Sequence, residues 1–249
     1  IPVHFAGKMC DIKNIKKIAK TNNLFLIEDC AHAIGAKFEN KHAGTFGDAG
    51  CFSFYPTKNI TTIEGGMVIC NSKNTAQGIQ SFRNHGITRT LKQRFSAGKP
   101  WDYDEIEPGY NFRLDEIRAS LGISQLKKIS KLNNMRRKAC EYYTSKLKKI
   151  KGIESPEISK STDNAFHLYI IKIKKDYGIS RDKLFLKLLD SGIRTSVHYK
   201  PLHDFTIFKK MAKIKRGLNN STTLYNEILS LPLYPTITQQ EQDYVIHNR

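Results

Sequence analysis

The sequence predicts an α/β protein, and three features of its first 70 residues support that prediction. Residues 24–29, LFLIED, form an apolar run that ends in two acids, which is typical of a central parallel strand. Residues 12–21 carry apolar side chains at helical spacing behind Asp11, a residue type that caps helix N-termini. Two further strand-like runs, CFSFY at 51–55 and MVIC at 67–70, flank a short loop.

The remaining elements follow in chain order. IPVHF at 1–5 is predicted as a strand and 73–84 as a helix, whereas 86–109 is long for a loop and indicates function or subunit contact. Further on, the patterns predict a helical stretch over 114–147, strands over 165–173 and 193–199, and helices over 180–191, near 220–230 and from Gln239 onward. We therefore expect a larger domain over 1–113, a long linking helix over 114–150 and a smaller α+β domain over 151–249.

Composition limits the classes of function. The chain has 249 residues, 39% of them hydrophobic, and no apolar run approaches the ~18 residues of a membrane-spanning helix. Its net charge of +18 favours anionic ligands, but the basic residues are spread over helix faces, which argues against a nucleic-acid partner. Five cysteines without a C-x-x-C pair predict free thiols in the cytoplasm, and no spacing of Cys and His predicts a metal site.

One lysine, Lys58, lies in the short loop between the runs at 51–55 and 67–70. Alone it reads as a surface lysine, but partial burial can lower the pKa of an amine so that it forms a Schiff base with an aldehyde. Asp29 ends the run at 24–29, where a carboxylate could cap the following turn or pair with a cationic ring nitrogen. A lysine Schiff base and an acid on a pyridinium nitrogen are the pair that pyridoxal phosphate (PLP) requires.

Five sequence blocks, in a fixed order, resemble the DegT/DnrJ/EryC1/StrS family. The blocks are IEDCAHAIGA, GTFGDAGCFSFYPTKNITTIEGGMV, RNHGI, GYNFRLDEIRASLGISQL and GIRTSVHYKPLH, and they cover essentially the whole chain. The family consists of PLP-dependent sugar aminotransferases of the aspartate aminotransferase (type I) fold. The resemblance therefore implies that fold, without its N-terminal part, since roughly the first third of the family's chain precedes the residue at which this sequence starts.

The resemblance also implies a role for each residue on the cofactor side. Lys58 corresponds to the Schiff-base lysine and is the implied catalytic residue, and Asp29 corresponds to the partner of the pyridinium nitrogen. His32 would lie over the cofactor ring, although a histidine satisfied by backbone at a helix start is the alternative. Ser53 would donate to the PLP phosphate. Asn111 would reach the phosphate in the neighbouring subunit, which implies a homodimer with shared active sites.

The substrate side is less defined. His198 and Tyr199, in HYKPLH, could contact the sugar or its diphosphate, and packing is the equal alternative. Arg113 follows Asn111 in its motif and is a further substrate-binding candidate. His85, in RNHGI, is either on the substrate side or structural.

The implied function is transfer of an amino group from an amino acid, most often glutamate, to a keto group of a nucleotide-linked deoxysugar, in cell-surface or secondary-metabolite glycan biosynthesis. Some members carry His in place of the lysine and perform deoxygenation, so Lys58 favours aminotransfer. The second hypothesis is a truncated, inactive member that acts as a binding or structural module. The sequence leaves open the keto sugar, the sugar carbon, the amino donor and whether the chain is a fragment.

Overall fold

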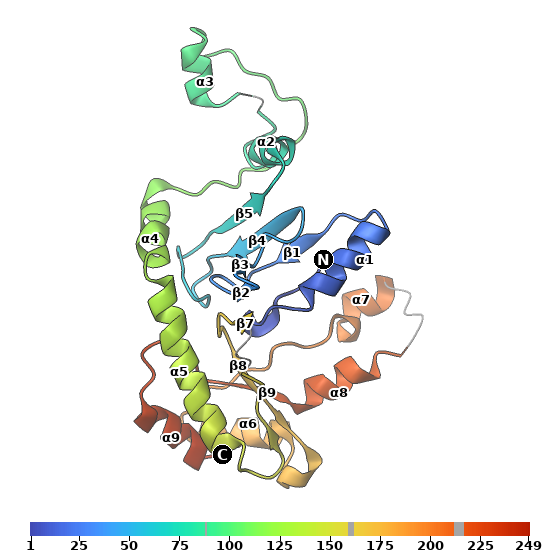
Figure 1. Cartoon of the computed structure of the whole chain (residues 1–249), viewed down its shortest axis with the longest axis vertical. Coiled ribbons are helices and arrows are strands. Elements are labelled where there is room, and N and C mark those ends of the chain that lie inside the picture. Colours follow the sequence, from blue (N-terminus) through green and yellow to red (C-terminus); the bar gives the residue numbers. More distant parts are fainter. Residues whose placement is uncertain (88, 159–161, 212–216) are drawn as a thin grey trace. The chain divides into compact units, whose positions relative to one another are not determined.

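The computed structural model describes residues 1–87, 89–158, 162–211 and 217–249 (Figure 1). The chain divides into two compact units. Unit 1 consists of Ile1–Phe5 and Met9–Ile129, and unit 2 consists of Ala6–Lys8 and Ser130–Arg249. The division therefore falls inside the linking helix that was predicted over 114–150.

Unit 1 is built on a three-stranded sheet with the order β1-β4-β5 (Figure 1). Strand β1 (Ile27–Asp29) runs parallel to β4 (Ala49–Ser53), and β4 pairs antiparallel with β5 (Gly66–Cys70). In the sequence between β1 and β4, the strands β2 (Lys37–Phe38) and β3 (Lys41–His42) form a tight antiparallel hairpin. The predicted strands at 51–55 and 67–70 are thus confirmed to within two residues.

The two N-terminal strand predictions were too long. Residues 1–5 pair through a single bridge between Val3 and Asp29, because Pro2 has no N–H to donate and the chain turns into the 3-10 helix Phe5–Gly7. In the run at 24–29, Leu24 and Phe25 are 60% and 87% exposed, and only the last three residues form β1. An apolar run therefore overstated the length of the buried strand.

The helices of unit 1 follow their local signals. Helix α1 (Ile12–Thr21) begins at Asp11, whose side chain accepts the Asn14 N–H as predicted. Helix α2 (Lys73–Phe82) confirms the helix predicted over 73–84. The segment at 86–109, predicted as irregular, contains helix α3 (Leu91–Ser96), because Thr90 and Gln93 form a capping box.

The linking helix predicted over 114–150 is two helices, α4 (Glu116–Leu126) and α5 (Ile129–Leu147). They are separated at Lys127 and Lys128, where the Lys128 N–H bonds to the Gln125 carbonyl three residues back, so the last turn of α4 tightens and ends. Over the described residues, none of the helices has both the length and the apolar character needed to cross a lipid bilayer.

Unit 2 packs helices against a sheet of order β6-β8-β9. The strands are β6 (Ile153–Glu154), β8 (Tyr169–Ile173) and β9 (Ile228–Leu231), and β6 pairs directly with β8. The short strand β7 (Thr162–Asp163) comes between β6 and β8 in the sequence but is not part of this sheet. The helices after α5 are the 3-10 helix Lys175–Tyr177, α6 (Arg181–Asp190), the 3-10 helix Leu202–Asp204, α7 (Thr206–Met211), α8 (Asn219–Glu227) and α9 (Gln239–His247). Tyr143 of α5 and Tyr169 of β8 stack in its buried core, with ring centroids 5.1 Å apart.

Three predictions in unit 2 needed correction. The helix expected near 220–230 ends at Glu227, because residues 228–231 pair with β8 as strand β9 and Pro232 favours extended backbone at Leu231. The strand predicted over 193–199 is reduced to one bridge between Ser196 and Ser230. The strand predicted over 165–173 begins only at Tyr169, where β8 starts, because Phe166 has a φ of 50° and interrupts the extended backbone, and helices α6 and α9 confirm the other two helix predictions.

A buried guanidinium joins three segments of unit 2. Nη1 of Arg136, on α5, donates to the carbonyl oxygens of Phe166, His167 and Leu233 at 3.2–3.4 Å. Burial lowers the pKa of Arg136, but an arginine stays charged over any working range of pH. Helix α5 is thereby fixed to the segment just before β8 and to the segment just after β9, through carbonyls that are buried or partly buried.

We expect Arg136→Met to lower the free energy of unfolding by about 2–4 kcal/mol, because it leaves buried carbonyl groups without a donor. Thermal unfolding followed by circular dichroism checks this. Lys138→Met is the matched control on the exposed face of α5 and should change stability by less than about 0.5 kcal/mol. Equal effects of the two substitutions would contradict the role given to Arg136.

Candidate functional site

The carboxyl ends of β1 and β4 form the edge at which the predicted cofactor-side residues gather. Asp29 ends β1 and lies in register with Cys51 of β4, and Ser53 ends β4. Because the two strands are parallel, these ends lie at the same edge of the sheet, where open α/β sheets bind ligands. His32 follows β1 and is buried, with its ring centroid 5.9 Å from that of Phe5.

Lys58 lies in the loop that leaves β4 at this edge. Its backbone N–H donates to the Tyr55 carbonyl at 3.0 Å, and its side chain is half-buried. Burial lowers the pKa of the Lys58 amine, and the nearby carboxylate of Asp29 offsets part of that effect. A lysine with a lowered pKa carries a larger fraction of neutral, nucleophilic amine than a surface lysine does.

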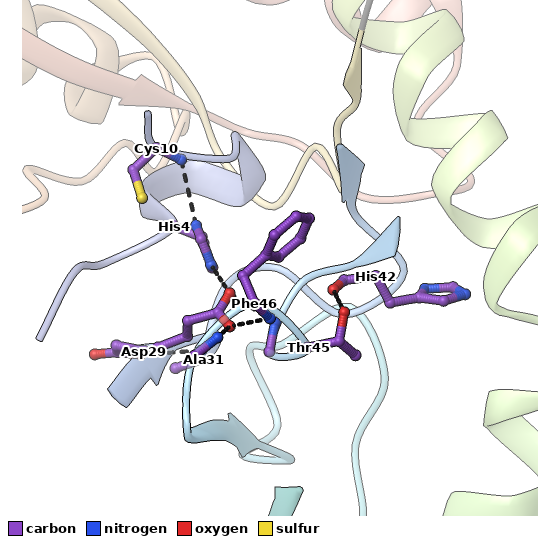
Figure 2. Close-up of polar contacts among 10 residues, drawn as sticks. His4, Cys10, Asp29, Ala31, His42, Thr45 and Phe46 are labelled. Atoms are coloured by element: carbon purple, nitrogen blue, oxygen red, sulfur yellow. Dashed lines mark hydrogen bonds and ion pairs between the residues drawn. The ribbon is translucent and has the colours of Figure 1, made fainter. Parts of the chain in front are cut away.

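Asp29 caps the following turn, the first of the two functions that its position suggested, whereas its pairing with a cationic ring nitrogen stays a prediction. Its Oδ1 accepts the Ala31 N–H at 3.0 Å, so the side chain caps the turn that follows β1 (Figure 2). Its charge also acts on Lys58, as described above. The neighbouring hydroxyl of Ser53 accepts the Tyr55 N–H at 3.4 Å, which places it at the start of the lysine-bearing loop.

A second carboxylate, Glu28, is fully buried beside Asp29 and was missed in the sequence. Oε1 accepts the N–H groups of Phe46 and Gly47 at 2.7 and 2.8 Å, and Oε2 accepts the Gly44 N–H at 2.9 Å. Burial alone raises the pKa of Glu28, but these bonds and a fourth from His4 outweigh it and hold the pKa below its ordinary value. The adjacent acids at the end of a buried strand were the available signal.

The fourth donor to Glu28 is the buried ring of His4. Its Nδ1 accepts the Cys10 N–H at 3.3 Å, so Nε2 carries the proton that is donated to Glu28 Oε2 at 2.8 Å (Figure 2). The potential ligand atoms of His4, Glu28 and Cys30 lie within 4.8 Å of one another. A metal ion would have to displace these donors, and burial raises the pKa of the Cys30 thiol, so the geometry is that of a hydrogen-bonded carboxylate.

Glu28 and Asp29 are adjacent in the strand, so their side chains point to opposite faces of the sheet and have different partners. Successive side chains of a strand point to opposite faces of the sheet. Glu28 is anchored on one face to the segment 44–47 and to His4, and this anchoring fixes the strand end that carries Asp29 on the other face. The buried carboxylate of Glu28 thus supports the half-buried carboxylate of Asp29 by fixing the strand end that carries it.

Asn111 and Arg113 lie in another part of unit 1. Both are exposed and line a cavity of about 1260 Å³ beside α2 and β5, and neither Lys58 nor Asp29 lines it. The segment is held by a bridge between Asn84 and Asn111 and by Arg113 Nη2, which lies 3.1 Å from His85 Nε2. The shared site predicted for Asn111 requires a second copy of the chain and stays a prediction.

His198 and Tyr199 belong to unit 2. His198 Nδ1 lies 2.7 Å from the hydroxyl of the buried Ser230, so β9 fixes the orientation of the imidazole. The Tyr199 ring meets the His198 ring edge-on at 4.8 Å and is 54% exposed. Packing thus holds His198, and the substrate contact predicted for the pair stays a prediction.

Comparison with known proteins assigns residues 1–248 to the DegT/DnrJ/EryC1/StrS aminotransferase family. The spore coat polysaccharide biosynthesis protein SpsC of Bacillus subtilis is 34% identical over 249 residues, which cover 99% of this chain and 64% of SpsC. The UDP-4-amino-4,6-dideoxy-N-acetyl-beta-L-altrosamine transaminase of Campylobacter jejuni is 35% identical over 243 residues, which cover 98% of this chain and 62% of that protein.

A solved structure confirms the predicted fold. The protein Spr1654 of Streptococcus pneumoniae, in its PLP form, matches this chain with a TM-score of 0.85 at 26% identity, over 99% of this chain and 66% of that one. The chain therefore spans somewhat less than two thirds of the length of these relatives.

We expect Glu28→Gln to lower the free energy of unfolding by about 2–4 kcal/mol, because the amide cannot accept from four donors at once. The folded pKa of Glu28 lies below its unfolded value, so its contribution is complete above the unfolded pKa and is lost as the pH falls through the folded one. Urea unfolding at several pH values should therefore show a smaller deficit of the variant in acid than at neutral pH. Glu39→Gln, which removes an exposed ion pair with Lys13, is the control, and a deficit that does not change with pH would contradict this account.

Proposed function

Because the chain belongs to the DegT/DnrJ/EryC1/StrS aminotransferase family, we propose that it acts in PLP-dependent transfer of an amino group from an amino acid to the keto group of a nucleotide-linked deoxysugar. Glutamate is the expected donor. One observation carries the proposal: a half-buried lysine with a lowered pKa shares the edge of the sheet with the carboxylate of Asp29. The names of SpsC and of the Campylobacter transaminase support glycan biosynthesis as the setting.

The residues at this edge fit PLP by the chemistry of each group. The Lys58 amine suits the aldehyde, and the Asp29 carboxylate suits the protonated ring nitrogen. The Ser53 hydroxyl is a donor for the phosphate, and the buried His32 ring offers an aromatic surface for the cofactor ring. In this proposal Asn111 completes the phosphate site of a second copy, so the active unit is a homodimer.

The chemistry is divided between the cofactor and two side chains. PLP, when bound, accepts the electron pair left when a C–H bond of the amino-acid substrate breaks. Nζ of Lys58, once released from the aldehyde, would take that proton as general base and return it one position along, which completes the first half of the transfer. Asp29 would hold the proton on the ring nitrogen throughout. The same two groups, acting in reverse order, would serve the keto sugar.

Partners and setting follow from the same chemistry. A net charge of +18 is compatible with a nucleotide diphosphate substrate, and His198, Tyr199 and Arg113 are the residues proposed to contact it. The five cysteines are free thiols, which suits a cytoplasmic reaction. No nucleic-acid or membrane partner is part of this proposal.

Lys58→Ala should abolish attachment of PLP and lower turnover by at least about 10²–10⁴-fold, because it removes both the covalent link and the general base. The measurement is a visible absorbance band with added PLP, followed by borohydride reduction and mapping of the labelled peptide. Lys20→Ala, at an exposed position of α1, should leave the band unchanged. A well-folded wild-type protein without a band or label would favour the alternative of an inactive binding module.

Asp29→Asn should still allow PLP to label Lys58 but should lower turnover about a hundredfold or more, because a neutral amide cannot hold the ring nitrogen protonated. It should also retain the turn cap, since the amide oxygen can still accept the Ala31 N–H. Single-turnover kinetics with the amino donor, beside a thermal unfolding curve, separate these effects. Wild-type kinetics in the variant would remove Asp29 from the reaction.

A further inference from the structure

The lysine loop, residues 55–65, is closed at its base by the backbone of Phe54. The Phe54 carbonyl accepts both the Thr61 hydroxyl, at 2.9 Å, and the Thr62 N–H, at 3.0 Å. The Phe54 N–H donates to the Gly65 carbonyl at 2.9 Å. Both ends of the loop are therefore tied to one residue, and Lys58 lies within the enclosed span.

The turn that closes the lysine loop has a backbone that needs support. Ile63 has a φ of 70°, which a β-branched residue adopts only when its surroundings impose it. Its N–H donates to the Thr61 hydroxyl at 2.8 Å, and the Thr62 hydroxyl donates to the Glu64 carbonyl at 2.8 Å. The placement of Thr61 and Thr62 thus decides whether the turn keeps this conformation.

Helix α4 supplies that placement from 64 residues away in the sequence. Oε1 of Gln125 accepts the Thr61 N–H at 3.0 Å. Gly122, one turn earlier on the same face of α4, approaches so closely that an added Cβ would lie 2.8 Å from Cγ2 of Thr62. A glycine inside a helix is unfavourable by itself, so this close approach gives a physical reason for it.

We propose that Gln125 is a positioning residue, whose amide oxygen holds the lysine loop at Thr61 and thereby sets the place of the Lys58 amine opposite Asp29. The inference rests on the proposed function of Lys58 and assigns a role to the SLGISQL part of the motif, which the reaction itself does not use. Gln125 acts through the loop and contacts no reacting atom.

The link between Gln125 and Lys58 is short and rigid. Only Asn59 and Ile60 separate Lys58 from Thr61, and their exposed fractions are 6% and 2%. Close-packed side chains transmit a displacement instead of absorbing it. Loss of the bond at Thr61 should therefore change the burial of the Lys58 amine, which is the largest cause of its lowered pKa.

The test uses three variants of α4 and two measurements that need no cofactor. Gln125→Met keeps the length of the side chain but has no comparable acceptor, whereas Gln125→Glu keeps an acceptor oxygen. Gly122→Ala should favour the helix and yet press on Thr62. Hydrogen exchange of the Thr61 amide reports on the bond, and pH-dependent acetylation of Lys58, read by mass spectrometry, reports on the amine. Ser124→Ala, on the exposed side of α4, is the control.

Gln125→Met should speed exchange at Thr61 about fivefold and move the midpoint of Lys58 acetylation to higher pH. Gln125→Glu should restore protection of the Thr61 amide. Gly122→Ala should change the Lys58 midpoint, because the added Cβ would displace Thr62. Exchange and acetylation in Gln125→Met that match Ser124→Ala, or faster exchange spread evenly over all peptides, would overturn the proposal.

PLP loading separates this inference from the proposed function. If wild-type protein takes no PLP on Lys58, the proposed function fails, whatever the α4 variants show. If it takes PLP and Gln125→Met changes neither Thr61 exchange nor the Lys58 midpoint, only the positioning role fails. If the role is correct, the visible band of Gln125→Met should titrate with a shifted midpoint and that of Gln125→Glu should lie nearer to wild type.

Discussion

The hydrogen bonds to the buried carboxylate of Glu28 are the interaction on which unit 1 most depends. Strand β1 has three residues, too few for its ladder alone to fix its position firmly. Four donors from His4 and the segment 44–47 converge on Glu28 and join three separate stretches of chain at the end of this strand. A buried ionised carboxylate is tolerated here because all of its acceptor positions receive hydrogen bonds. These hydrogen bonds also fix the position of the adjacent Asp29.

Asp29 and Lys58 show how burial and charge are balanced at the edge of the sheet. Full burial of Lys58 would make the amine neutral at a cost in folding free energy, whereas a close ion pair would keep the amine protonated. Here burial has the larger effect on the Lys58 pKa and the carboxylate the smaller. In the proposed function, this balance would favour reaction of the amine with an aldehyde and leave the carboxylate free to pair with a cationic ring. The balance depends on the loop, and the loop depends on α4 as well as on the sheet.

The two units are stabilised in different ways. Unit 2 has a continuous apolar core in which α5, β8 and β9 contribute Tyr143, Tyr169 and Leu229, with Arg136 serving the carbonyls at its border. The candidate site of unit 1 instead rests on polar anchors, in which a side chain meets backbone groups of a distant segment. Such anchors specify position more narrowly than apolar packing does, because each needs a donor and an acceptor at a defined distance.

The sequence by itself determined the features that depend on neighbouring residues. Asp11 begins α1 as its pattern predicts, the runs at 51–55 and 67–70 form β4 and β5, and the order of the motifs identified the family and its fold. Lys58 and Asp29 could be predicted as candidate site residues from their motifs, because an amine and a carboxylate have the chemistry that the proposed cofactor needs. The strand predicted over 24–29 was too long because an apolar side chain is not always buried: Phe25 is 87% exposed.

Only the tertiary structure decided which distant groups meet. The donors to Glu28 lie 16–24 residues away along the chain, and Gln125 lies 64 residues from Thr61. No periodicity or capping pattern encodes such pairs, since each depends on how whole elements pack. Helix and strand propensities act over a few residues, whereas a buried polar group must find its partner wherever the fold brings one.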